Sequence, residues 1–90
     1  MNEYELQAQY DARKSFYGKA RVTTHLNEKS EMVISLYSYE TLVCYIVNKK
    51  PVVLGTYSQT TLSHIKEFLI QHGFIAETKA QIEKDYKKVN

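Results

Sequence analysis

One cysteine and three histidines are the residues of this chain whose types most often do chemistry, as nucleophiles, general bases or metal ligands. Cys44 could act as a nucleophile only beside a base and in an exposed, electropositive setting that lowers its pKa. It lies instead in the apolar stretch 41–47, where a free cysteine usually serves as a small buried side chain. We therefore expect Cys44 to be structural.

The histidines and carboxylates do not form a metal-binding or acid–base pattern. His64 and His72 are eight residues apart, about two helical turns, and His25 belongs to a different element. Closed zinc sites need about four ligands drawn from short-spaced pairs, and no glycine-rich phosphate loop is present because the glycines are isolated. These observations predict a protein that is not an enzyme and that has no metal, cofactor or catalytic residue.

Tyrosine is the compositional anomaly, with eight copies in 90 residues and no tryptophan. Its apolar ring and water-tolerant hydroxyl make it common at interfaces, but strands also favour it for cross-strand packing. Packing is the simpler explanation at any single position, whereas a cluster on one uncovered sheet face would mark a partner or dimer surface. The clustered tyrosines are Tyr37, Tyr39, Tyr45 and Tyr57.

A basic segment interleaved with aromatic residues follows an acidic N-terminus. Acids without bases occur in 1–12 and bases without acids in 13–21, the largest local charge contrast of the chain. Such a segment is typical of a nucleic-acid contact, although a solvated strand entry gives the same pattern. The net charge of +2 and the pI near 8.6 are too low to decide between a nucleic-acid contact and a solvated strand entry. The candidate nucleic-acid contacts are Arg13, Lys14, Lys19 and Arg21.

Composition predicts one folded domain over residues 1–90. Hydrophobic residues make up 43% and charged residues 24% of the chain, the balance of a globular protein. Ninety residues support a single core. Within this domain we expect four parts: a loose N-terminal arm at 1–12, an antiparallel sheet at 19–57, a main helix at 58–72 and a C-terminal helix at 78–88.

Alternating and β-branched residues predict the strands of the sheet. Short polar reversals separate the segments, and the stretch 41–47 is apolar on both faces, which is typical of a central strand. The predicted strands are 19–26, 31–37, 41–47 and 52–57. The chain therefore predicts an α+β fold: an antiparallel meander of three or four strands, followed by an amphipathic helix packed on one face and a short C-terminal helix.

The main helix carries signals at both of its ends. Ser58 or Thr60 can accept hydrogen bonds from the first free backbone N–H groups. Gly73 supplies the left-handed residue that ends the helix, and Phe74 can fold back onto Leu69.

The apolar face of this helix is continuous and predicts packing against the sheet. Glu67 is expected to point away from the sheet into solvent, and so is Ile70, which would then be the docking point for the C-terminal helix. Thr78 and Gln81 form a candidate capping box for that second helix. The apolar stripe consists of Leu62, Ile65, Leu69 and His72, flanked by Phe68.

Three features favour a cytoplasmic protein without membrane association. A single cysteine excludes an intramolecular disulfide and agrees with a reducing compartment. The start MNEYELQAQY lacks the basic and apolar regions of a signal peptide. No apolar run approaches the roughly 18 residues needed to span a bilayer.

Four segments resemble a known family: YDARKSFYGKA at 10–20, LYSYETLV at 36–43, and YSQTTLSHIKEFLIQHGF with TKAQIEKDY at 57–74 and 78–86. They are similar to small uncharacterised proteins carried by plasmids and phages of low-GC Gram-positive bacteria. Such families are generally domains of unknown function, so the resemblance implies no catalytic residue. It implies a mobile-element context, where short single-domain proteins often bind host machinery, and anti-CRISPR proteins resemble this profile.

We therefore expect a non-catalytic inhibitor that binds a host defence nuclease, an anti-CRISPR acting on a single-effector Cas protein or its guide-RNA complex. One alternative is a nucleic-acid-binding accessory protein of plasmid maintenance or transfer. Another is a module whose main task is homo-oligomerisation, for instance as a homodimer. Because aromatic and arginine residues dominate interface energetics, the expected partner-binding residues are Arg13, Arg21, Tyr37, Tyr39 and Tyr57.

Overall fold

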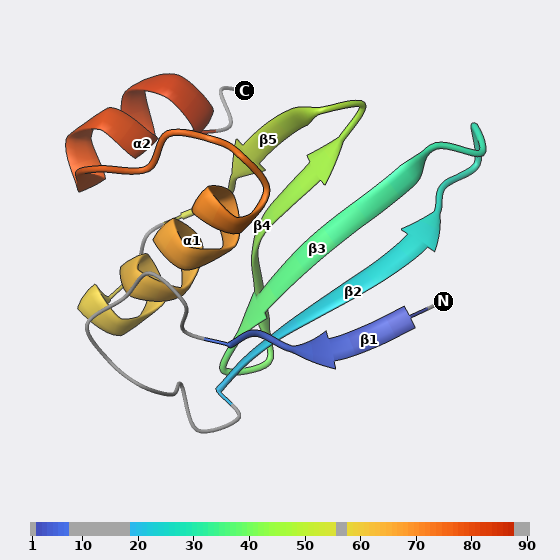
Figure 1. The fold of residues 1–90 in the computed structure, drawn as a ribbon, viewed down its shortest axis with the longest axis horizontal. Coiled ribbons are helices and arrows are strands. Elements are labelled where there is room, and N and C mark those ends of the chain that lie inside the picture. Colours follow the sequence, from blue (N-terminus) through green and yellow to red (C-terminus); the bar gives the residue numbers. More distant parts are fainter. Residues whose placement is uncertain (1, 8–18, 56–57, 88–90) are drawn as a thin grey trace.

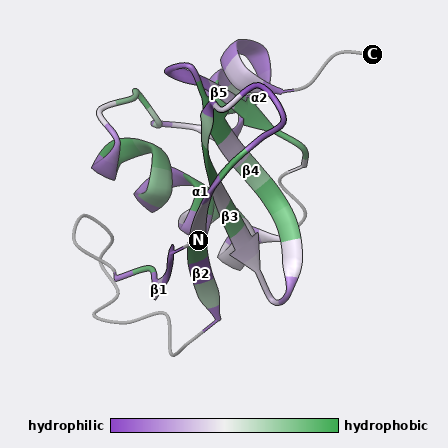
Figure 2. Cartoon of the chain, turned by 90° about the vertical axis from the view of Figure 1, so that its right-hand side faces the viewer, coloured by the Kyte–Doolittle hydropathy of each residue, from purple (hydrophilic) through white to green (hydrophobic). Residues whose placement is uncertain are grey.

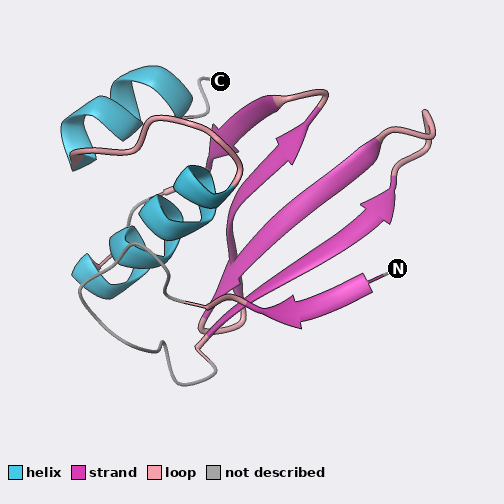
Figure 3. Ribbon diagram, viewed as in Figure 1, coloured by secondary structure: helices cyan, strands magenta, loops and turns pink. Residues whose placement is uncertain are grey.

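A computed structural model of the chain describes residues 2–7, 19–55 and 58–87. It contains one antiparallel sheet and two helices, and is therefore an α+β fold as predicted (Figures 1 and 3). In chain order the elements are β1 (Asn2–Glu5), β2 (Ala20–Leu26), β3 (Met32–Ser38), β4 (Thr41–Val47), β5 (Lys50–Val53), α1 (Gln59–Gln71) and α2 (Lys79–Tyr86).

The sheet is a meander of five strands in the order β1-β2-β3-β4-β5, one more than the upper limit expected. The additional strand is β1, which lies within the predicted N-terminal arm and pairs antiparallel with β2. All four of its residues are exposed, so β1 has no apolar face. Backbone pairing holds it in place, and a hydrophobic pattern cannot reveal such a strand.

The long strands β2, β3 and β4 bury one shared face under α1. Val22, Leu36, Cys44 and Val53 are in register across β2 to β5, and each is fully buried. Figure 2 shows that β4 is coloured as hydrophobic along much of its length. A register shift between Leu36 and Tyr37 accompanies the burial of two successive β4 residues, Val43 and Cys44; bulges redirect side chains in this way.

The ends of α1 match the predicted signals. The Ser58 hydroxyl accepts a hydrogen bond from the Thr61 amide at 3.2 Å. At the other end, the Phe74 amide donates to the Leu69 carbonyl at 2.9 Å and the Gly73 amide to the Ile70 carbonyl at 3.0 Å. This pair of bonds is a Schellman motif. Gly73 has φ +85°, a conformation that glycine adopts without steric cost.

Glu67 is the main correction to the predicted helix. It was expected in solvent, but only 1% of it is exposed. Gln71 donates from Nε2 both to a Glu67 carboxylate oxygen, at 2.6 Å, and to the Gln7 carbonyl, at 2.7 Å. The segment after β1 therefore runs along this side of α1, where fully buried Leu6 also joins the core.

The second helix begins as predicted and docks beside β5, at the edge of the sheet away from β1 (Figure 1). The Thr78 hydroxyl accepts from the Gln81 amide at 3.0 Å, whereas the Gln81 side chain accepts from the Glu77 amide at 2.8 Å, one residue earlier than in a standard capping box. Ile82 is fully buried. Ile70 is half-buried against the core.

Leu69→Ala should lower the free energy of unfolding by about 2 to 5 kcal/mol, because Leu69 is fully buried beneath the sheet. Ile75→Ala is the matched control, since Ile75 is 63% exposed and should change stability by no more than about 0.5 kcal/mol. Urea titrations of both variants measure the difference. A loss below about 0.5 kcal/mol at Leu69 would contradict its place in the core.

Candidate functional site

Arg21 and Tyr37 form the centre of the candidate site, on the sheet face opposite α1. The β2–β3 register places them directly opposite each other. The Arg21 guanidinium carbon lies 4.4 Å from the centroid of the Tyr37 ring, which is the geometry of a cation–π contact. The same face carries Tyr45, the partner of Ser35. Tyr37 and Tyr45 therefore lie on the sheet face opposite the one that carries Ile34, Leu36 and Ile46.

Two carboxylates hold the Arg21 guanidinium in this position. Its two terminal nitrogens lie 3.0 Å from a Glu3 oxygen on β1 and 3.0 Å from a Glu40 oxygen in the β3–β4 turn. The hydrogen bond to Glu40, followed by the charges of both carboxylates, raises the pKa of Arg21 despite some desolvation. The guanidinium is therefore a fixed cation whose charge is already balanced nearby.

Lys19 and Tyr39 repeat this arrangement at the end of the strands. The Tyr39 amide donates to the Lys19 carbonyl at 2.9 Å, and the Lys19 ammonium lies 5.7 Å from the Tyr39 ring centroid. The Tyr39 ring is 5.9 Å from that of His64 and is tilted against it. The Lys19–Tyr39 pair therefore lies at the end of the sheet next to α1, beside the face that carries the Arg21–Tyr37 pair. We call these two neighbouring pairs, Lys19, Arg21, Tyr37 and Tyr39, the tyrosine–base surface.

The turn that presents Tyr39 has an unfavourable backbone. Tyr39 and Glu40 have φ values of 52° and 69°, the left-handed pair of a two-residue hairpin turn that usually contains asparagine and glycine. Left-handed φ costs about 1–2 kcal/mol for an ordinary residue. Such strain tends to persist at functional positions, and here it leaves Tyr39 49% exposed at the hairpin tip.

Of the seven residues named from the sequence as candidate partner or nucleic-acid contacts, the structure places four in two pairs, Arg21 with Tyr37 and Lys19 with Tyr39. The other three, Arg13, Lys14 and Tyr57, lie outside the described residues. Glu3 and Glu40 were not anticipated as part of the site, because their pairing with Arg21 depends on strand register and turn geometry.

A buried polar cluster joins β3 to α1 and was also missed. The Ser38 hydroxyl lies 2.8 Å from His64 Nδ1 and 3.1 Å from the Thr61 hydroxyl. A serine beside a histidine is the pairing used by nucleophilic hydrolases. However, Ser38 is only 2% exposed and His64 is fully buried, so the observed contacts hold the helix against the strand. Twenty-six residues separate the pair, too far apart for a local motif.

The remaining reactive groups are isolated. Burial raises the pKa of the Cys44 thiol to about 12, so its nucleophilic thiolate is scarce at neutral pH. Among the described residues, no group of three or more histidine, cysteine or acidic side chains is arranged to hold a metal ion. Within that same part of the chain, neither helix is long and apolar enough to cross a membrane.

Comparison with known families gives one match, to a family of unknown function (DUF8033), over residues 4–84. This range includes every element from β2 to α1 and nearly all of α2. The search of curated proteins found no match, and neither did the search of solved structures.

The Cys44 thiol should make the protein less stable in alkali. Its folded-state pKa of about 12 exceeds the ordinary value of 9.0, so above pH 9 the folded state binds more protons than the unfolded state. Deprotonation of Cys44 therefore does not affect the free energy of unfolding below pH 9, and it lowers this free energy as the pH rises towards 12. Between about pH 9 and 11 the free energy of unfolding should fall by roughly 1 kcal/mol per pH unit more than in Cys44→Val.

Urea titrations across this pH range measure both slopes, and the tyrosines and lysines common to both proteins cancel in the difference. Equal slopes would contradict burial of the thiol.

Proposed function

The chain belongs to DUF8033, a family of unknown function, and we propose that it is a small binding protein that occupies a surface on a macromolecular partner without catalytic turnover. The observation that supports this proposal most is the tyrosine–base surface. It combines tyrosine and arginine, the residue types that contribute most to protein interfaces. Arg21 and Tyr37 lie on the paired strands β2 and β3, so their backbone has little conformational entropy left to lose on binding.

The contacts within the surface favour a partner whose binding does not require an excess of positive charge on the tyrosine–base surface. Arg21 and Tyr37 are stacked, and two carboxylates share the guanidinium. A phosphate backbone is recognised mainly by unneutralised lysine and arginine, and it would have to compete with Glu3 and Glu40. A protein surface that packs on the tyrosine rings has no such competition. This comparison favours a protein partner over nucleic acid.

The proposed partner class is a host defence nuclease, with a single-effector Cas protein or its guide-RNA complex as the specific candidate. The support is the similarity of the chain to small proteins of Gram-positive plasmids and phages, together with the tyrosine–base surface. Inhibition by occupying a nuclease surface would take place in the cytoplasm, where such nucleases act. It would require about one copy of the protein per nuclease.

A cleavage assay with increasing amounts of the protein tests this function. Inhibition should be complete near one copy per nuclease, and Tyr37→Ala or Tyr39→Ala should weaken binding at least about tenfold, as expected for hot-spot residues. Tyr4→Ala is the matched control, because Tyr4 is 45% exposed but lies outside the surface. Circular dichroism confirms that each variant is folded.

Three results would contradict the proposal. Complete inhibition far below one copy per nuclease would indicate catalysis. No effect on any defence nuclease of the natural host would exclude the nuclease as partner. Binding to DNA or RNA that falls steeply with salt, and whose salt dependence is reduced by Arg21→Ala, would favour the alternative of a plasmid accessory protein.

A further inference from the structure

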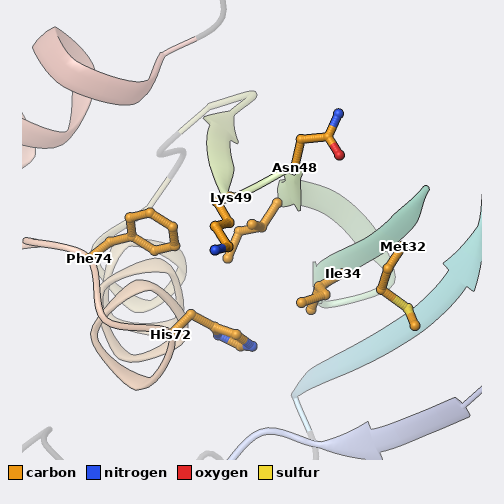
Figure 4. A pocket seen from close by; sticks show the side chains of 7 residues that line it. Met32, Ile34, Asn48, Lys49, His72 and Phe74 are labelled. Atoms are coloured by element: carbon orange, nitrogen blue, oxygen red, sulfur yellow. The ribbon is translucent and has the colours of Figure 1, made fainter.

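A groove lies at the end of the sheet opposite the tyrosine–base surface. It has a volume of about 360 Å³, within the range of about 300–1,000 Å³ typical of small-molecule sites. It opens on the side of the sheet that α1 covers, beyond the end of that helix. Its lining residues are Met32, Ile34, Ile46, Asn48, Lys49, His72 and Phe74 (Figure 4).

Most of the groove is apolar because the strands extend further than the helix that covers them. Ile34 and Ile46 are cross-strand partners on β3 and β4, and Phe74 follows the last turn of α1. Beyond them, the cross-strand pair Leu26 and Met32 is 62% and 55% exposed. The wall therefore offers an apolar chain a continuous surface that leads out of the groove.

Lys49 is the one lysine or arginine among the residues that line the groove. Lys49 reaches over it from the β4–β5 turn with its ammonium towards the side of His72 and Phe74 (Figure 4). No ion pair involving Lys49 occurs among the described residues. Asn48 points away from the groove and donates to Glu31. His72 donates from Nδ1 to the Phe68 carbonyl at 2.8 Å, which fixes its ring against the last turn of α1.

Lys49 occupies a position where lysine is unfavourable for the fold. Asn48 and Lys49 have φ values of 53° and 62° and form the left-handed pair of a two-residue turn, for which Asn-Gly is the preferred sequence. The first position has its preferred residue, while the second carries a lysine in place of glycine. Backbone strain of this kind is often retained where the side chain has a function.

We propose that this groove binds a free amphipathic carboxylate, such as a medium-chain fatty acid. Its carboxylate pairs with the Lys49 ammonium beside His72, and its apolar chain lies on Ile34, Ile46 and Phe74 and leaves past Met32. Charge complementarity defines the ligand, because the groove combines apolar walls with one cation that lacks an ion pair within the described chain. The site is separate from the tyrosine–base surface, which lies at the other end of β3.

Octanoate tests the site, with 1-octanol and octylammonium as probes of the same apolar length. In methyl-detected NMR, octanoate should bind saturably and shift the Ile34, Ile46 and Met32 methyl groups, and both other probes should bind more weakly. Lys49→Gly should weaken octanoate binding about two- to fivefold, the size of one partly exposed ion pair. The same variant should raise the urea midpoint because it relieves the turn. Lys49→Arg should retain binding.

Lys50→Ala is the matched control, since Lys50 is exposed and adjacent in sequence but does not line the groove. Equal affinity for octanoate and 1-octanol, or unchanged affinity in Lys49→Gly, would overturn the proposal by showing a merely apolar patch. Shifts confined to other methyl groups would overturn it as well. So would the absence of saturable octanoate binding, the result expected if the groove accepts a polypeptide segment of a partner.

Discussion

The packing of α1 against one face of the sheet is the interaction on which the rest of the molecule depends. A row of fully buried side chains crosses four strands beneath it: Val22, Leu36, Cys44 and Val53. A chain of 90 residues has little other apolar surface to bury. Two features of the fold are unfavourable on their own. One is the pair of hairpin turns with left-handed residues other than glycine, and the other is the edge strand β1, which has no apolar face. They persist because this central contact stabilises the strands that carry them.

The same contact explains where the two candidate sites lie. Because α1 covers one face of the sheet and contacts Ser38 at the end of β3, Tyr37 is left on the uncovered face, and the Met32 end of β3 projects beyond the helix. At one end of β3, Tyr37 and Tyr39 lie beside the side-chain cations of Arg21 and Lys19. At the other end lies the groove above Ile34 and Ile46. The two candidate sites are therefore held at a constant separation by a single rigid strand and can act independently of each other.

Local signals in the sequence were sufficient for most of the fold. The caps at Ser58 and Gly73 and the alternation over 31–47 depend on residues close together in the chain, so they could be read directly. Three features could not, because each depends on distant partners. β1 is defined by its pairing with β2, buried Glu67 shares the Gln71 side-chain amide with the distant Gln7 carbonyl, and Ser38 meets His64 only after the sheet and helix have packed.

The candidate site was predicted only in part, for a related reason. Its residue types were identifiable from the unusual tyrosine content, and Arg21, Tyr37 and Tyr39 were among the candidate residues named from the sequence. Their arrangement was not predictable, because the stacking of Arg21 on Tyr37 requires the exact β2–β3 register.

The two edges of the sheet also differ: α2 lies along β5, with a bridge from Val53 to Lys87, whereas every residue of β1 is exposed. Only the β1 edge is open to pairing with a strand of another copy of the chain. Two copies that pair through their β1 edges leave no open edge, so edge-to-edge pairing would stop at a dimer and would not continue into a filament.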